Sequence, residues 1–263
     1  TLRYLDSSRG WAMEGGSFVT TASDGSIASI TLSKGTGEPN VSDFKSGDLA
    51  LLANCANAEI FAVTGPNASN QLSPNAVGTG PTDNLGKPVA QQPQSAPRLF
   101  DLNTDFFTVT YYLQVVDSGN GSTTGALIRR VNGVDSEIVR GAERLDFLYG
   151  VEDTNGDTRY LTASEVDTGT NCPPSVPTTL GTDPGCLWRS VKSIEVRILM
   201  DGQQPLYTLG ANEMMYSYAA DGNTTPVSPD DSSRSVKPSE QGFANQMIRR
   251  EFSALFSVRN YNP

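Results

Sequence analysis

The sequence predicts a fold built mainly from antiparallel β-strands, with little helix. Three observations support this prediction. Short runs alternate apolar and polar residues, turns rich in Gly, Asn and Ser separate these runs, and the chain closes on a run of the same kind. Alternation with a period of two is typical of strands with one buried face, and short runs between such turns are typical of hairpins and meanders.

The first eleven residues carry a weak helical pattern. Leu2 and Leu5 are at i, i+3 spacing, and a Gly-Gly pair at positions 15 and 16 would end a helix. We therefore expect residues 1–16 to be the remnant of an N-terminal helix with its connection, and residues 17–263 to form one β-rich head. The chain has no run of about 18 apolar residues and no apolar signal region at its start, so we expect a processed or truncated piece of a longer protein.

Three short strands are predicted in the first quarter of the chain, at residues 26–32, 48–53 and 58–64. The strongest strand pattern follows at residues 105–116. There, alternate positions hold large apolar side chains that would share one face of a core strand: Phe107, Val109, Tyr111, Leu113 and Val115.

The second half of the chain continues the pattern. A Gly-rich turn leads into a predicted strand at 126–131, and Asn132-Gly133 is a hairpin signal into a strand at 136–140. Further alternating runs cover 145–151 and 194–200. The chain then ends on a strand whose apolar face we expect to be docked in the main sheet, because an apolar terminus is otherwise unprotected. That face consists of Phe252, Ala254, Phe256 and Val258.

Proline positions predict three long loops. Fourteen of the sixteen prolines lie within residues 65–98, 168–187 and 201–238, and proline cannot donate a hydrogen bond to a central strand ladder. Loops longer than about 15 residues are uncommon inside compact domains and are often functional. The three loops are expected to form either a binding surface or solvated excursions.

Composition excludes several classes of function. The formal net charge is −10 and basic residues do not cluster, which argues against nucleic-acid binding. The chain contains no histidine, so it lacks the commonest general base and metal ligand and every nucleophile–histidine pair. We expect a protein that is not an enzyme and needs no cofactor.

The three cysteines are Cys55, Cys172 and Cys186, and the last two enclose a segment rich in Pro and Gly. We predict a disulfide between Cys172 and Cys186, which would stabilise the fold by about 3 kcal/mol in the chain-entropy model and would imply an oxidising compartment. Three buried or free thiols are the alternative.

An acidic turn gives the single candidate metal site. Asp153, Asn155 and Asp157 place oxygen ligands at positions 1, 3 and 5, as at the start of a calcium-binding loop. The glycine and the acidic residue that should follow are out of place by two positions and one position. A plain Asn-Gly turn between two strands explains the same residues.

Several segments together, in this order along the chain, resemble the PilW-type minor pilins of bacterial type IV pili. The resemblance covers roughly half of the residues, from about position 48 to the end. The segments that carry it are 54–64, Val109-Thr-Tyr-Tyr112, 137–151 with Arg159-Tyr160, 191–199, Arg249-Arg-Glu-Phe252 and Val258-Arg-Asn-Tyr-Asn-Pro263. The segment from Cys172 to Cys186 is not part of this pattern, and we expect it to be a surface loop.

The resemblance implies a pilin-like α+β fold, in which a long N-terminal helix, apolar in its first half, precedes a large antiparallel β-rich head. It also implies a structural subunit that primes pilus assembly at the fibre tip and serves motility, adhesion and DNA uptake. The implied partners are other minor pilins, the major pilin and a large tip adhesin. The helix would hold the protein in the inner membrane, with the head in the periplasm, before the subunit reaches the extracellular tip.

Two alternatives stay open. The nearer one is a pseudopilin J-like tip subunit of type II secretion, which gene neighbours and a deletion phenotype would distinguish from a pilus subunit. The other, from a different class, is an exported carbohydrate-binding or hydrolytic β domain. Paired carboxylates for glycoside hydrolysis would be expected in that case, but no pair stands out among the twenty-nine acidic residues.

Overall fold

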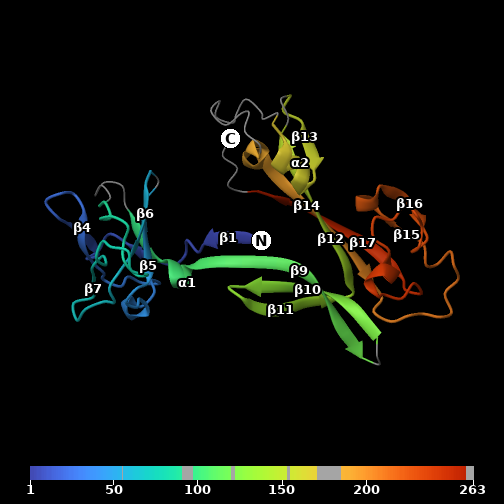
Figure 1. Ribbon diagram of the computed structural model, residues 1–263, viewed down its shortest axis with the longest axis horizontal. Coiled ribbons are helices and arrows are strands. Elements are labelled where there is room, and N and C mark those ends of the chain that lie inside the picture. Colours follow the sequence, from blue (N-terminus) through green and yellow to red (C-terminus); the bar gives the residue numbers. More distant parts are fainter. Residues whose placement is uncertain (55, 91–96, 120–121, 153–154, 171–184, 259–263) are drawn as a thin grey trace. The chain divides into compact units, whose positions relative to one another are not determined.

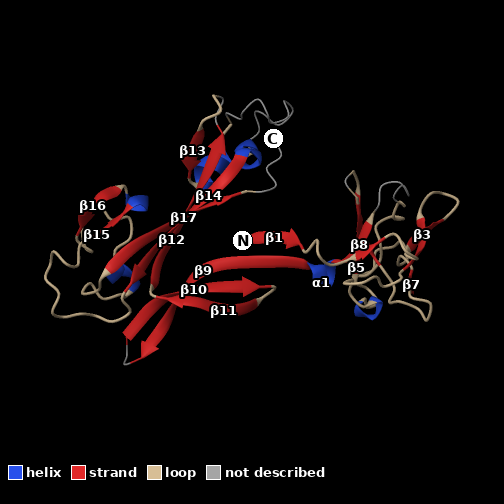
Figure 2. Ribbon diagram, turned by 180° about the vertical axis from the view of Figure 1, so that it is seen from behind, coloured by secondary structure: helices blue, strands red, loops and turns tan. Residues whose placement is uncertain are grey.

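The computed structural model describes residues 1–54, 56–90, 97–119, 122–152, 155–170 and 185–258. Strands predominate, helices are few and short, and the strand pairs with a described register are antiparallel (Figure 1; Figure 2). The prediction of an antiparallel β-rich fold is therefore confirmed. No helix among the described residues has the length and apolar character needed to cross a membrane.

The chain divides into two compact units. Unit 1 comprises Thr1–Thr110 with Val131–Gly133, and unit 2 comprises Tyr111–Arg130 with Val134–Pro263. One head over residues 17–263 stays a prediction, and the first 110 residues form a unit with a core of its own.

Besides β1 (Leu2–Leu5) and the start of β9 (Phe106–Gly119), the described residues of unit 1 form two small sheets and two short helical elements. The four-stranded sheet has the order β2-β8-β5-β6, and the three-stranded sheet has the order β3-β4-β7. The strands are β2 (Trp11–Ala12), β8 (Arg98–Asp101), β5 (Leu49–Ala53), β6 (Ala58–Ala62), β3 (Phe18–Thr21), β4 (Ile27–Thr31) and β7 (Gln71–Leu72), and the helical elements are η1 (Val41–Asp43) and α1 (Leu102–Asp105). Three of the strands were predicted, at 26–32, 48–53 and 58–64.

The core of unit 1 follows from alternation along these strands. On β5, Ala50 and Leu52 are fully buried, whereas Leu49 is exposed to solvent. Trp11 lies at the centre of the core, and its ring packs on Phe44 with the centroids 5.0 Å apart. The burial of several large side chains in one cluster is the main stabilising term for this unit.

One side chain closes the free edge of β6. Asn84 is buried, and its Oδ1 accepts a hydrogen bond from the Ala62 N–H at 2.7 Å while its Nδ2 donates to the Ala62 carbonyl at 3.1 Å. The Asn75 N–H also donates to the Ala62 carbonyl at 2.9 Å, so both backbone groups of Ala62 on this edge have partners.

The predicted helix at the start of the chain is wrong. β1 (Leu2–Leu5) pairs with β9 (Phe106–Gly119), with Leu2 opposite Val109 and Tyr4 stacked on Phe107 at 5.5 Å between ring centroids. A helix of so few residues is marginal, because nucleation fixes several residues before it gains hydrogen bonds. Pairing with a long strand instead gives the same backbone groups immediate partners.

β9 was predicted to be a core strand, and this prediction is only half right. The strand forms, in a sheet of order β1-β9-β10-β11 with β10 (Ser122–Val131) and β11 (Val134–Arg140). Of the five alternating apolar residues, Val109 is buried, whereas Tyr111 and Val115 are exposed. Alternation shows which side chains share a face, and it does not show whether another element covers that face.

Unit 2 is built on a four-stranded sheet of order β13-β12-β14-β17. Its strands are β13 (Thr158–Leu161), β12 (Ala142–Glu152), β14 (Val191–Asp201) and β17 (Arg249–Ser257), which confirms the strands predicted at 145–151, 194–200 and the C-terminal run. A two-stranded sheet pairs β15 (Tyr216–Tyr218) with β16 (Asn223–Val227), and the remaining elements are α2 (Ala163–Thr168), η3 (Cys186–Ser190), η4 (Ala219–Asp221) and η5 (Pro238–Gln241).

The predicted long loops differ in outcome. The loop expected at 201–238 contains β15, η4 and β16, and the loop expected at 65–98 contains β7. Most of the loop expected at 168–187 lies outside the described residues. Short strands in Pro-rich segments escape prediction because they are too brief to show alternation.

Candidate interaction surface

The two faces of the β12-β14-β17 sheet differ in chemistry. Antiparallel register places residues of the three strands in rows, and each row has all its side chains on one face. On one face these rows are apolar: Leu145–Ile198–Phe252, Phe147–Val196–Ala254 and Tyr149–Ile194–Phe256. We call these nine residues the apolar face.

Only one end of the apolar face is covered by described residues. Tyr149 and Ile194 pack against a cluster formed by Val151, Val166, Leu187 and Val191, to which α2 and η3 contribute. The Tyr149 ring also meets the Trp188 ring edge-on at 4.9 Å. Beyond this end the face is open.

Water reaches large side chains on β17 at both ends of the apolar face, including Phe256 in the same row as Tyr149 and Ile194. Phe252 is 59% exposed and Phe256 is 57% exposed. The expectation that the C-terminal strand buries these rings is therefore wrong, although the strand itself forms and pairs along its length with β14. Contiguous exposed apolar surface on a soluble domain marks an interaction site.

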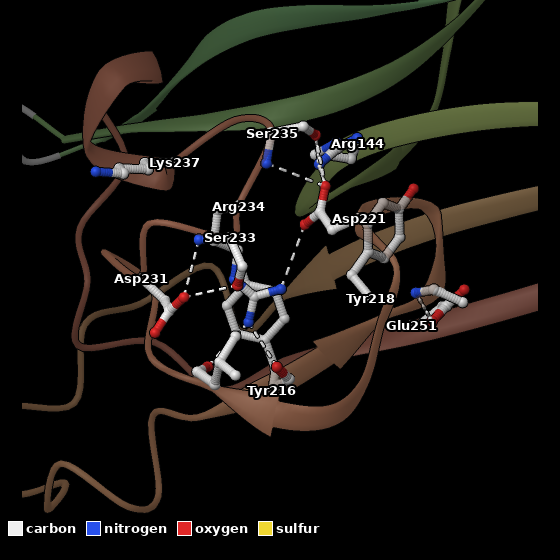
Figure 3. Close-up of polar contacts among 12 residues, drawn as sticks. Arg144, Tyr216, Tyr218, Asp221, Asp231, Ser233, Arg234, Ser235, Lys237 and Glu251 are labelled. Carbon is white, nitrogen blue, oxygen red and sulfur yellow. Dashed lines mark hydrogen bonds and ion pairs between the residues drawn. The ribbon is translucent and has the colours of Figure 1, made fainter.

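The opposite face of the same sheet is polar and carries the segment 202–248. The Tyr218 hydroxyl, on β15, donates to Asp146 Oδ2 on β12 at 2.6 Å, and the Ala219 N–H donates to Glu251 Oε2 on β17 at 2.9 Å. Leu199 on β14 is buried together with Tyr216 and Tyr218. Figure 3 shows Tyr216, Tyr218 and Glu251 in this region.

Arg234 is the centre of this packing. Its side chain has no exposure to solvent, its guanidinium carbon lies 3.5 Å from the Tyr216 ring centroid, and it donates to the Val227 carbonyl at 2.9 Å (Figure 3). It also forms an ion pair with Asp221 at 3.4 Å. A desolvated cation on an aromatic face is attracted by the ring quadrupole, and planar arginine is well suited to such stacking.

Arg144 reaches the same carboxylate from the sheet. Its Nη1 lies 2.6 Å from Asp221 Oδ1, and its guanidinium carbon lies 4.7 Å from the Tyr218 ring centroid. Burial on its own would raise the pKa of Asp221, but hydrogen bonds from Ser235 and Arg144 outweigh it and lower that pKa below its ordinary value. Asp221 therefore stays ionised and joins the two arginines.

A third buried arginine, Arg249, lies at the start of β17. Its Nε and Nη2 donate to the two Glu143 carboxylate oxygens at 2.6 and 2.8 Å, and its remaining donors bind the carbonyls of Ala244, Asn245 and Met247. All five guanidinium N–H donors thus have partners. Both side chains are fully buried.

Burial also perturbs the acid of this pair. Burial raises the pKa of Glu143, Arg249 opposes this, and the neighbouring Asp201 adds to it, so that the pKa lies at about 7. We call Arg144, Arg234 and Arg249 the arginine clamp. With side-chain exposures of 11%, 0% and 0%, the clamp does not present a cation to a ligand, and it serves to fix the segment 202–248 to the polar face.

The predicted site residues are only partly described. Asp153 and Cys172 lie outside the described residues, so the calcium site and the Cys172–Cys186 pairing stay predictions. Asn155 and Asp157 lie in the turn between β12 and β13. Cys186 is buried and disulfide-bonded, and its partner is outside the described ranges. Within those ranges no group of three or more His, Cys, Asp or Glu side chains is placed to hold a metal ion.

Comparisons with known proteins give one match. The family model described as Type IV Pilus-assembly protein W matches residues 110–260. This stretch is more than half of the chain and contains the apolar face and the arginine clamp, whereas nearly all of unit 1 lies before it. No curated protein and no solved structure matches the chain.

Proposed function

The chain belongs to the family of type IV pilus-assembly protein W, and from this premise we propose that it is a minor pilin. In this role it is a structural subunit of the complex that primes pilus assembly and then occupies the fibre tip. Its work is assembly by contact between subunits, and it catalyses no reaction.

The apolar face is the observation that supports this proposal. Nine apolar residues from three strands share one side of the sheet, and the rings of Phe147, Phe252 and Phe256 remain exposed on it. An enzyme pocket would combine a concavity with a few converging polar groups. A broad apolar sheet face is instead suited to packing against another secondary-structure element.

The dimensions of the face fit an α-helix. Adjacent strands lie roughly 4.8 Å apart, so the outer strands of the three are separated by about 10 Å. A helix with its side chains has a diameter of about 10–12 Å. We propose that an apolar pilin helix lies along β14, between β12 and β17, and buries the open rows of the face.

The partners and the location follow from this role. The helix that fills the face belongs to a pilus subunit, and other minor pilins, the major pilin and a large tip adhesin are the proposed partners. The head acts first in the periplasm, on a protein anchored in the inner membrane, and later outside the cell. The disulfide at Cys186 supports an oxidising compartment.

Two substitutions on one strand test the proposal. Phe252 and Leu255 are both 59% exposed on β17, but they lie on opposite faces of the sheet. We expect Phe252→Asp to abolish recovery of other minor pilins when the protein is purified from a piliated cell, and to reduce surface pili. Leu255→Asp should preserve both.

The controls separate folding from assembly. Both variants should melt at the temperature of the native chain, because each replaces an exposed side chain. Equal recovery of minor pilins with Phe252→Asp and with the native chain would contradict the proposed role of the apolar face. A deletion that impairs protein secretion and leaves pili intact would contradict the pilus assignment itself.

A further inference from the structure

The two edges of the unit 2 sheet are protected very differently. β13 forms one edge, has four residues including the charged Arg159, and leads into α2, which packs on it. β17 forms the other edge and has nine residues; its first three, Arg249-Arg-Glu251, are charged, but it contains no Pro and no bulge in its register with β14. Natural sheets normally blunt their edges with short, charged or covered strands.

The backbone of β17 is open for pairing. The Val258 N–H donates to the Lys192 carbonyl, which fixes the alternation and points the backbone groups of Phe252, Ala254 and Phe256 at β14. Those of Ser253, Leu255 and Ser257 then point away from the sheet. Within the ranges that the structure describes, no hydrogen bond reaches these outward N–H and C=O groups.

The composition of the open stretch is neutral. From Phe252 to Ser257 the strand carries only Phe, Ser, Ala and Leu, and Phe252, Leu255 and Phe256 are each more than half exposed. An edge of this length without charge is a template for another strand. Nothing in it selects against an identical strand.

We propose that β17 pairs antiparallel with β17 of a second copy of this chain, about a two-fold axis at Leu255. This inference is distinct from the proposed helix contact, because its hydrogen bonds use the free backbone edge of β17, whereas the helix would lie on the apolar face along β14. An interface of this kind is isologous, so that each copy offers the same strand to the other.

The sequence of the strand is complementary to itself in this register. With Leu255 opposite Leu255 of the second copy, Ser253 faces Ser257, Ala254 faces Phe256 and Phe252 faces Val258. Each apolar residue meets an apolar one and each serine meets a serine, with a small side chain opposite a large one beside the axis. Cross-strand pairs of this type stabilise antiparallel sheets, whereas like charges opposite each other destabilise them.

The register also joins two surfaces. Side chains of Phe252, Ala254 and Phe256 lie on the same side of the sheet in both copies, so the apolar faces become continuous across the new pair of strands. The result is one sheet running from β13 of one copy to β13 of the other.

Opposite charges placed on the axis test this arrangement. We expect the purified chain to form a dimer by sedimentation equilibrium, and Leu255→Lys and Leu255→Glu each to lower the association constant at least tenfold, because like charges then meet. An equimolar mixture of the two variants should recover a dimer with one copy of each. The matched controls are Val134→Lys and Val134→Glu on β11, an exposed strand edge in the same unit, and they should leave association unchanged.

Three results would overturn the proposal. They are a native chain that stays monomeric at all concentrations, charged variants that dimerise as well as the native chain, and a mixture that stays monomeric. Circular dichroism melting of each variant at the native temperature establishes that lost association is not lost folding. Failure here leaves the minor-pilin role intact, because recovery of other pilins tests a different residue, Phe252.

Discussion

Unit 1 and unit 2 reach stability by different means. In unit 1 one cluster holds twelve buried apolar residues, Trp11 among them. In unit 2 the largest described clusters hold four and three buried residues, and three nearly buried arginines tie a long segment to the sheet. Both units expose single apolar side chains, such as Ile60 in unit 1, but unit 2 leaves the rings of Phe147, Phe252 and Phe256 exposed on one face of one sheet.

The different ways in which the two units are stabilised indicate that unit 2 is the one with a surface for a partner. Buried ion pairs contribute little net stability over apolar packing of the same volume, but breaking one is costly. The arginine clamp therefore fixes the geometry of unit 2 without consuming its apolar face. A unit that must offer apolar surface to other subunits has to be held together on its other side.

The largest expected effect is the loss of one clamp residue. Arg249→Met leaves Glu143 buried without its counter-charge and three carbonyls without donors, so we expect unit 2 to lose about 3–5 kcal/mol of unfolding free energy. Hydrogen exchange read separately over the two units measures this. Arg250→Met, the exposed neighbour, is the control and should change the value by less than about 0.5 kcal/mol.

A cavity in the core of unit 1 should reduce the unfolding free energy somewhat less, and should do so in unit 1 alone. Leu99 is fully buried in the unit 1 core, and Leu99→Ala should reduce the unfolding free energy by about 3 kcal/mol through lost burial and an unfilled cavity. We expect faster exchange in unit 1, with unit 2 protected as before. Equal loss of protection in both units would show that they unfold as one. Leu85→Ala, at a residue almost fully exposed, is the neutral control.

Glu143, the ion-pair partner of Arg249, should make the stability of unit 2 depend on pH. Burial raises the pKa of Glu143 from 4.5 to about 7, so between these values the folded chain holds a proton that the unfolded chain releases. The resulting stability is complete below pH 4.5 and is lost as the pH rises through 7. We expect a decrease on the order of 2 kcal/mol between pH 5 and pH 8. Urea unfolding of Glu143→Gln across this range should show a flatter profile, and an unchanged profile would assign the sensitivity to another group.

The smallest effect on stability is expected on the apolar face. Phe252→Ser removes a ring that is more than half exposed, so the unfolding free energy should change by less than about 0.5 kcal/mol. Leu199→Ser, at a buried residue of the same sheet, should destabilise the unit by several kcal/mol in the same thermal unfolding assay. A large loss with Phe252→Ser would mean that the ring belongs to the core and not to an interface.

Sequence alone predicted the strands of unit 2 better than their surroundings. The runs at 145–151, 194–200 and the C-terminus form strands because period-two alternation is a local property of the chain. Whether Phe252 is buried depends on which element lies over it, and neither alternation nor hydropathy carries that information. The same limit explains why Tyr111 and Val115 were placed in a core.

The arginine clamp was missed for a related reason. Arg144, Arg234 and Arg249 have no feature that separates them from surface arginines, because a buried charge is recognised by its partners and these are far away in the sequence. Glu143 and Arg249 are 106 positions apart. The predicted N-terminal helix was wrong for another reason. A pair of leucines at helical spacing is weak evidence for a helix when a long strand elsewhere in the chain offers partners for the backbone.

The side-chain amide of Asn84 affects how unit 1 can associate with other chains. By occupying both hydrogen-bonding groups of Ala62, it acts as a terminator that keeps further strands from growing onto that sheet at this point. At this position the edge of β6 therefore cannot serve as a template for a strand of another chain, which limits aggregation through unit 1.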